Sequence, residues 1–305
     1  MIEELRKQNI SEDLLEKVIE FREKYPIDDK FEYRVPKADY IYIGKKVWEQ
    51  AITALLQGQH ILLVGPKATG KNLLADNLAQ LFNRSAWKVS FHVNTDEAQR
   101  IGMDTFKDTQ VQLRKGPIYL AAEEGGFAVF DEVNMAKNEA LAVLHSALDY
   151  RRVIDVAGYD RIKLNPSSRF IATMNYGYLG TRELNEALLS RFMIIDMPSV
   201  SKEVLGQIIS LNYPTIKADQ AQYFIDFFKD IELKVENSEI SSKALDLRGL
   251  ISALGAIEMG LQPIEALEMG VVNKTFDEFE KQVLMDLIKL NFPKDLKAGD
   301  VFNGK

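Results

Sequence analysis

The sequence of 305 residues contains no cysteine, and this absence excludes disulfide bonds, thiolate catalysis and zinc sites built on cysteine. Its three histidines, His60, His92 and His145, stand far apart and match no metal-ligand spacing. Positive charge is also scarce, since 38 Lys and Arg face 45 Asp and Glu and leave a net charge of −7. The composition therefore gives no overall basic field that would favour a nucleic-acid partner.

The sequence also lacks a long hydrophobic run. Its N-terminus is charged and has no apolar signal-peptide core, and no later stretch approaches membrane-spanning length. It has no long-period repeat and no low-complexity tract, which argues against a solenoid or a disordered tail. We therefore expect a cytoplasmic protein without a membrane span, long enough to form one large domain or two smaller ones.

What the sequence does contain is a glycine-bounded loop between a predicted strand and a predicted helix. Residues 61–64 are apolar, and apolar side chains recur at helical spacing over residues 73–82. In the phosphate-binding pattern GxxxxGK[ST], backbone N–H groups face the phosphates, the lysine reaches the β- and γ-phosphates, and the helix N-terminus adds partial positive charge. We predict that nucleotide phosphates bind to this loop, which consists of Gly65, Pro66, Lys67, Ala68, Thr69, Gly70, Lys71, Asn72 and Leu73.

Asn72 departs from this pattern, because it stands where serine or threonine is usual. A hydroxyl there normally binds Mg²⁺ directly, whereas asparagine offers only its amide carbonyl oxygen, on a longer side chain. Asn72 is therefore a predicted Mg²⁺ ligand. The same substitution leaves open an alternative, in which the protein binds ATP and hydrolyses it poorly.

Polar side chains follow two further predicted strands. Asp131 and Glu132 end the apolar run 127–130, and the buried strand predicted at 169–173 ends at Met174 and Asn175. The alternation of strands and helices predicts a parallel sheet, which binds ligands at the carboxyl ends of its strands. In a phosphate site, Asp131 can hold Mg²⁺, usually through water, while Glu132 polarises the attacking water. Asn175 could then hydrogen-bond the γ-phosphate or that water.

Periodicity, caps and turn residues predict the remaining elements. Before residue 200 they are helices at 11–24, 45–56, 118–124, 138–148 and 183–190, strands at 87–93 and 193–197, and a hairpin that pairs 152–157 with 161–164. After residue 200 there is no convincing strand, and helices are predicted at 202–212, 219–230, 240–258, 263–272 and 275–290. The expected division is an N-terminal helical extension, 1–43, a nucleotide-binding core, 44–200, and a helical lid, 201–305.

Taken in order, these motifs resemble the MoxR-like AAA+ ATPases, most closely the branch that contains CbbQ, NorQ and GvpN. The resemblance covers roughly residues 44–290 and rests on GPKATGKN as Walker A, FAVFDEVN as Walker B, the hairpin, ATMN as sensor 1, and NEALLSRF as the arginine-finger segment. It implies an α/β fold: an AAA+ P-loop NTPase with a three-layer αβα core and a C-terminal all-helical lid. ATP and Mg²⁺ are the implied cofactors.

The resemblance also implies roles for individual residues. Lys71 would contact the phosphates, Asp131 the Mg²⁺ ion, Glu132 would activate water, and Asn175 would be sensor 1.

Two arginine roles are implied as well. Arg191 would reach the nucleotide of a neighbouring subunit, where the transition state spreads negative charge, and Arg182 could share that role. A sensor 2 arginine is expected early in a helix of the lid, and Arg248 is the candidate. Lys243 competes with it, because the surrounding sequence departs from the usual motif.

The implied function is a Mg²⁺-dependent ATPase that forms a homo-oligomeric, hexameric ring. Such a ring would act as a chaperone that remodels, activates or assembles a client protein, with a partner that bears a von Willebrand factor A domain. A nucleotide-gated scaffold is the first alternative, because of Asn72. A nucleic-acid-directed motor is the second, and the acidic balance and the lack of a basic, aromatic-studded stretch argue against it.

Overall fold

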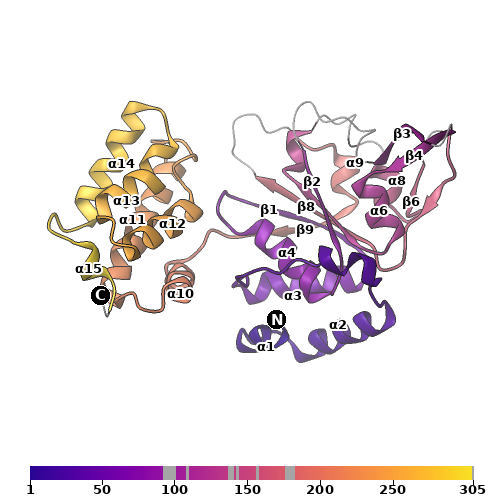
Figure 1. The fold of residues 1–305 in the computed structure, drawn as a ribbon, viewed down its shortest axis with the longest axis horizontal. Helices are drawn as coiled ribbons and strands as arrows, with labels where there is room; N and C mark the ends of the chain where they lie inside the picture. Colours follow the sequence, from indigo (N-terminus) through magenta and orange to yellow (C-terminus); the bar gives the residue numbers. More distant parts are fainter. Residues whose placement is uncertain are drawn as a thin grey trace. The chain divides into compact units, whose positions relative to one another are not determined.

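The computed structural model of the protein describes residues 1–91, 101–107, 110–136, 141, 144–155, 158–175 and 183–303. The chain forms two compact units. The first consists of Met1–Pro66 and Gly70–Pro198, and the second of Lys67–Thr69 and Ser199–Lys305. Figure 1 shows that the first is built from a sheet and helices and the second from helices.

The first unit contains the strands β1 (His60–Gly65), β2 (Ala86–Ser90), β3 (Gly102–Lys107), β4 (Gln110–Lys115), β5 (Phe127–Asp131), β6 (Val153–Ile154), β7 (Ile162–Lys163), β8 (Arg169–Asn175) and β9 (Phe192–Asp196). Its helices are α1 (Ile2–Lys7), α2 (Glu12–Lys24), α3 (Lys45–Leu56), α4 (Lys71–Leu81), α6 (Pro117–Glu123), α8 (Leu144–Leu148) and α9 (Glu186–Leu189), with the 3-10 helices η1 (Asp29–Arg34) and η2 (Val133–Met135). The second unit contains α10 (Lys202–Asn212), α11 (Ala218–Glu236), α12 (Leu247–Glu258), α13 (Pro263–Gly270), α14 (Glu278–Asn291) and α15 (Ala298–Val301), with η3 (Val272–Lys274).

Five of the strands form one parallel sheet in the order β2-β5-β8-β1-β9. This sheet, with its flanking helices, confirms the predicted α/β fold. The strands are parallel, so the carboxyl ends of β1, β5 and β8 lie along the same edge of the sheet. Gly65, the last residue of β1, is paired directly with Asn175, the last residue of β8. The register therefore brings the predicted phosphate loop next to the predicted sensor residue.

Both faces of this sheet are apolar, because its central strands are nearly continuous apolar runs and successive residues point to opposite sides. Ile61 and Leu63 join a cluster that includes residues of α2, α3 and α4, whereas Leu62 joins a second cluster with residues of α6 and α8. Strand β8 divides in the same way, with Ile171 in the first cluster and Phe170 in the second. Figure 1 shows the helices of these clusters on opposite sides of the sheet. The result is a three-layer αβα unit.

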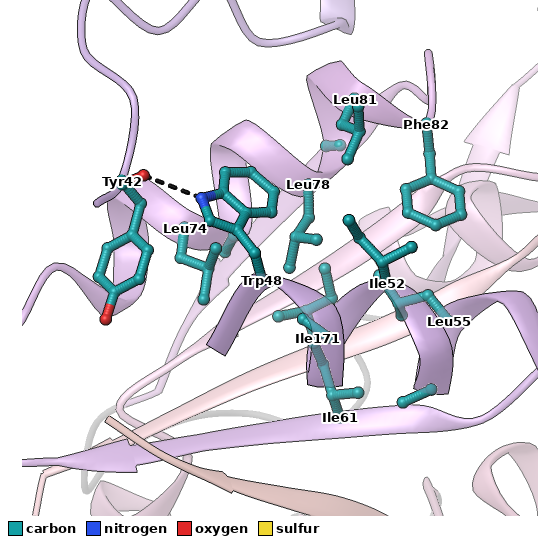
Figure 2. Packing of buried hydrophobic residues seen from close by; sticks show 14 of the residues in the cluster. Tyr42, Trp48, Ile52, Leu55, Ile61, Leu74, Leu78, Leu81, Phe82 and Ile171 are labelled. Atoms are coloured by element: carbon teal, nitrogen blue, oxygen red, sulfur yellow. Dashed lines mark hydrogen bonds between the residues drawn. The ribbon is translucent and has the colours of Figure 1, made fainter. Parts of the chain in front are cut away.

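The first cluster holds the helix that follows the phosphate loop. Figure 2 shows Trp48 of α3 beside Leu74 and Leu78 of α4, and its indole N–H donates to the carbonyl oxygen of Tyr42 at 2.8 Å. Asn77 of α4 is fully buried and accepts a hydrogen bond from the Tyr42 N–H at 2.7 Å. The segment before α3 is thereby fixed against α4. The N-terminal helices α1 and α2 contribute buried residues to the same cluster.

The second unit has its own apolar core, to which α10 to α15 all contribute buried side chains. Phe224, Phe227 and Phe292 form part of it, with ring centroids 4.9 Å and 5.6 Å apart for the two pairs that include Phe292. Within the described residues, no helix is long and apolar enough to cross a membrane.

The observed elements correct several predicted ones. The helix predicted over 240–258 begins only at Leu247, because the Asp246 side chain caps it by accepting the N–H of Arg248 at 3.1 Å. Helix α11 extends to Glu236, beyond the predicted end at 230. The antiparallel hairpin of β3 and β4 was not predicted, and neither were α1 and α15. Parts of the predicted helix 138–148 and of the predicted strand 87–93 lie outside the described residues.

Arg169, the first residue of β8, lies at the amino ends of the strands and hydrogen-bonds to neighbouring backbone carbonyl groups. Its side chain is almost fully buried, and burial lowers its pKa to about 10. The guanidinium donates to the carbonyl oxygens of Leu55 at 2.7 Å, Pro166 at 2.7 Å and Ser168 at 2.8 Å. These bonds tie the end of α3 to the start of β8.

We expect Arg169→Met to lower the free energy of unfolding of the first unit by about 2–3 kcal/mol, since buried carbonyl groups lose charged donors. Urea unfolding followed by tryptophan fluorescence measures this unit, because both tryptophans, Trp48 and Trp87, belong to it. The matched control is Arg161→Met, whose side chain is 65% exposed. It should change the free energy by less than about 0.5 kcal/mol. Equal effects of the two substitutions would contradict this role of Arg169.

Candidate functional site

The predicted phosphate loop connects β1 to α4 through a tight turn. Ala68 and Gly70 have left-handed backbone conformations, with φ values of 65° and 84°. Gly65 is also confined, because a Cβ atom added to it would lie 2.4 Å from the carbonyl oxygen of Met197. Glycine is therefore required at position 65 by close packing and is favoured at position 70 by the backbone angle. The turn ends at the N-terminus of an eleven-residue helix, where backbone N–H groups can bind an anion.

The other predicted loop residues differ in their surroundings. Thr69 is buried, with 3% of its surface exposed. Leu73 packs against the apolar cluster of α3 and α4, so only its backbone is available to a phosphate. Lys67 belongs to the second unit by its contacts, and its ammonium group donates to the carbonyl oxygen of Ser242 at 3.4 Å.

Lys71 lies at the start of α4 with only 8% of its surface exposed. Its ammonium group donates to the carbonyl oxygens of Gly65 at 2.9 Å and Pro66 at 2.6 Å. Burial lowers the pKa of Lys71 to about 8, while the nearby carboxylates of Asp131 and Glu132 oppose this shift. A phosphate beside Lys71 would add negative charge and favour the ammonium form.

Asp131, the last residue of β5, receives hydrogen bonds on both carboxylate oxygens. The side-chain amide of Asn72 donates to Oδ2 at 3.0 Å, and the hydroxyl of Thr173 donates to Oδ1 at 2.8 Å. The same hydroxyl oxygen accepts the backbone N–H of Glu132 at 3.2 Å. Thr173 thus holds both residues of the acidic pair in place.

Glu132 adopts a left-handed backbone conformation directly after β5, with φ 52° and ψ 50°. Its carboxylate accepts a hydrogen bond from the Asn175 amide at 3.4 Å, which is a long contact. The backbone carbonyl of Asn175 in turn accepts from the Asn134 side chain at 2.8 Å. The structure therefore brings Lys71, Asn72, Asp131, Glu132 and Asn175 together at one edge of the sheet.

The side chains around Asp131 fit a Mg²⁺ ion whose ligands are mainly phosphates and water. Among the described residues, no three His, Asp or Glu side chains gather in a way that could hold a metal by themselves. Mg²⁺ commonly keeps several water ligands and binds through one or two carboxylates and substrate phosphates, which Asp131 could support through water. The atom that Asn72 presents to Asp131 is its amide nitrogen, which is a donor and not a metal ligand.

The predicted arginine residues lie elsewhere in the chain. Arg191 follows α9 and donates to the carbonyl oxygens of His145, at 3.2 Å, and Ala187, and it forms an ion pair with Asp149 at 3.7 Å. These contacts join Arg191 to α8, to the turn after it and to α9, and involve none of the residues around Asp131. Arg182 lies outside the described residues.

Arg248 is exposed in the first turn of α12, which is early in a helix as expected for sensor 2. Together with Lys67, Asp246 and Lys274 it lines a groove of the second unit. Its competitor Lys243 is exposed in the segment before that helix.

Thr173 and Asn134 are the site residues that sequence reasoning missed. A signal for Thr173 was present, because it is a polar residue within an apolar strand and lies two residues before Asn175. In a strand this spacing puts both side chains on the same face of the sheet. Asn134 is the last residue of the FAVFDEVN stretch and lies in η2, but no periodicity there indicated that its side chain would contact Asn175.

Comparison with known proteins gives independent matches. Residues 60–192 match a family model described as AAA domain, dynein-related subfamily. The uncharacterised protein YojN of Bacillus subtilis is 30% identical over 298 residues, which cover 96% of this chain and 97% of YojN. Uncharacterised proteins of Staphylococcus saprophyticus and Staphylococcus epidermidis are 31% and 32% identical, over 83% and 81% of this chain and 98% and 95% of their own. A crystal structure of an ATPase candidate from Cytophaga hutchinsonii is similar over 64% of this chain and 56% of its own, with 22% identity and a TM-score of 0.46.

The lowered pKa of Lys71 leads to a prediction for nucleotide affinity. Its free-state pKa is about 8, and bound phosphates would raise it, so binding takes up a proton and weakens as pH rises through this value. We expect ATP to bind about tenfold more weakly at pH 9 than at pH 7. Titration with a fluorescent ATP analogue at the two pH values measures this ratio.

Two lysine-to-arginine substitutions separate this effect from general alkaline effects. Lys71→Arg should abolish the pH dependence, because a guanidinium stays charged at pH 9. Lys88→Arg should retain it, since Lys88 is an exposed residue of β2 paired with Asp76. A tenfold loss that persists in Lys71→Arg would show that another group is responsible.

Proposed function

Because this chain belongs to the AAA+ ATPase family, we propose that it is a MoxR-like ATPase that hydrolyses Mg²⁺-bound ATP within a homo-oligomeric ring. The proposal is supported above all by the meeting of Lys71, Asp131, Glu132 and Asn175 at the carboxyl ends of β1, β5 and β8. These residues come from three separate stretches of the sequence and supply a cation, a metal-side carboxylate, a base and an amide. Phosphoryl transfer from ATP needs these groups and little covalent chemistry from the protein.

Each group has a distinct task in this proposal. Lys71 binds the phosphates together with the N–H groups of its loop, which fixes the nucleotide in position. Glu132 orients and polarises the attacking water, and Asn175, which already contacts the Glu132 carboxylate, positions that water from the other side. Asp131 supports Mg²⁺ through water. When bound, the ion supplies positive charge to the phosphate oxygens in the transition state.

Arg191 is proposed to complete the site of a neighbouring subunit. Its contacts within the chain are made with residues of α8 and α9 and the turn that follows α8, outside the group around Asp131. A guanidinium supplied in trans would offset the negative charge of the transition state. Arg182 remains the second candidate for this role, and Arg248 is proposed as sensor 2 on the strength of its place in the first turn of α12.

The proposed biological role is that of a chaperone that remodels, activates or assembles a client protein. Nucleotide state would move the helical unit against the core within a hexamer, and subunit contacts would carry the motion to the client. The ordered motifs resemble those of MoxR-like proteins, and this resemblance supports the client role and a partner with a von Willebrand factor A domain. A nucleotide-gated scaffold is the second candidate, favoured by the contact of Asn72 with Asp131.

A subunit-mixing experiment tests whether Arg191 acts across an interface. We expect Glu132→Gln and Arg191→Ala each to abolish ATP hydrolysis when assayed alone. Mixed in equal amounts, they should recover about one quarter of the wild-type rate per subunit, since a random ring pairs an intact Glu132 with a neighbour's intact Arg191 at that frequency. The measurement is phosphate release at saturating ATP and Mg²⁺.

The control mixes Arg191→Ala with the double variant Glu132→Gln/Arg191→Ala, which offers no intact Arg191 and should show no recovery. Recovery in the first mixture alone supports the proposed site. If neither mixture recovers activity although mixed rings form, Arg191 does not act in trans. Full activity of Glu132→Gln by itself would overturn the catalytic assignment.

A further inference from the structure

The hydrogen bond between Asn72 and Asp131 has a fixed direction. Asp131 Oδ2 lies 3.0 Å from the amide nitrogen of Asn72. A carboxylate only accepts hydrogen bonds, so the amide must turn its NH₂ group toward Asp131 and its carbonyl oxygen away. Thr173 donates to the other carboxylate oxygen at 2.8 Å. Asp131 is therefore held by one protein donor on each oxygen.

An amide and a hydroxyl differ in what they can do at this position. A serine or threonine hydroxyl carries its hydrogen and its lone pairs on the same oxygen, so it can donate to Asp131 and coordinate a cation at the same time. An asparagine amide separates the donor and the acceptor on two atoms that point in different directions. To offer its oxygen to a cation beside Asp131, Asn72 must turn its amide and give up a charge-assisted hydrogen bond.

The anion-binding groups nearby do not depend on that rotation. Lys71 is held at the loop by the carbonyl oxygens of Gly65 and Pro66, and the N-terminus of α4 follows directly. Both favour phosphate charge with or without a metal. The arrangement thus separates the part of the site that binds phosphates from the part that would bind the cation.

We propose that the hydrogen bond from Asn72 to Asp131 opposes cation binding in the resting site. ATP binding by this chain is then nearly independent of Mg²⁺. The ligand of the resting site is then the nucleoside triphosphate itself, bound by Lys71 and the loop. Mg²⁺ then adds little to the affinity for ATP and is needed for ATP hydrolysis. This inference rests on the proposed function, because it concerns the same ATP site.

The experiment compares the affinity for ATP in the presence of EDTA and of excess Mg²⁺, measured by titration with a fluorescent ATP analogue and without hydrolysis as readout. For the wild-type chain, we expect a change of less than about threefold. For Asn72→Ser, which supplies a hydroxyl, Mg²⁺ should raise the affinity by about tenfold or more. For Asn72→Ala, which frees Asp131 but adds no ligand, the increase should lie between these two.

The three affinity ratios together test the role of Asn72. Equal Mg²⁺ dependence in the wild-type and Asn72→Ser chains would overturn the inference, as would an Asn72→Ala chain that responds to Mg²⁺ no more than the wild type. Circular dichroism establishes that the variants are folded. The result also separates this inference from the proposed function. A wild-type chain that binds no ATP under either condition overturns both. A wild-type chain that binds ATP only with Mg²⁺ overturns the inference about Asn72 alone.

Discussion

The parallel pairing of β8 with both β1 and β5 determines where the groups of the candidate site lie. Gly65 faces Asn175 across one pair, and Phe130, next to Asp131, faces Ala172, next to Thr173, across the other. A shift of either register by one residue would turn the side chains of that strand to the opposite face of the sheet. Two buried apolar clusters, one on each face, oppose such a shift. The site therefore inherits its geometry from hydrophobic packing that involves none of its own polar groups.

Thr173 converts this register into an arrangement of charges. Its one hydroxyl donates to the Asp131 carboxylate and accepts the backbone N–H of Glu132. Glu132 has a left-handed backbone, which for a residue other than glycine costs on the order of 1 kcal/mol. A hydrogen bond to a charged carboxylate contributes about 1.5–3 kcal/mol, enough to offset that strain. The Glu132 carboxylate, which follows directly after β5, accepts the long hydrogen bond from Asn175 at 3.4 Å.

The sequence allowed the phosphate loop and the parallel sheet to be predicted, because strands, caps and glycine turns leave local signals. Contacts between strands were not accessible in this way. That Asp131 meets Thr173 depends on a register set by packing across the whole sheet. The hairpin of β3 and β4 was missed because no alternation of apolar and polar residues runs through β3. The helix predicted over 240–258 was too long, because the prediction followed the apolar periodicity and did not use Asp246 as the N-cap.

The charges at the loop favour the proposed separation of phosphate binding from metal binding. Burial disfavours the ammonium form of Lys71, and the two carboxylates only partly compensate. A triphosphate relieves this cost directly, by placing negative charge beside the ammonium group. A cation near Asp131 acts in the opposite direction, because it opposes the carboxylate field that helps to keep Lys71 charged. With the Asn72 amide already bound to Asp131, these charges would favour the anion as the first ligand of the proposed site. If the proposed ring forms, its subunits would be loaded by ATP concentration, and metal and neighbour contacts would then govern turnover.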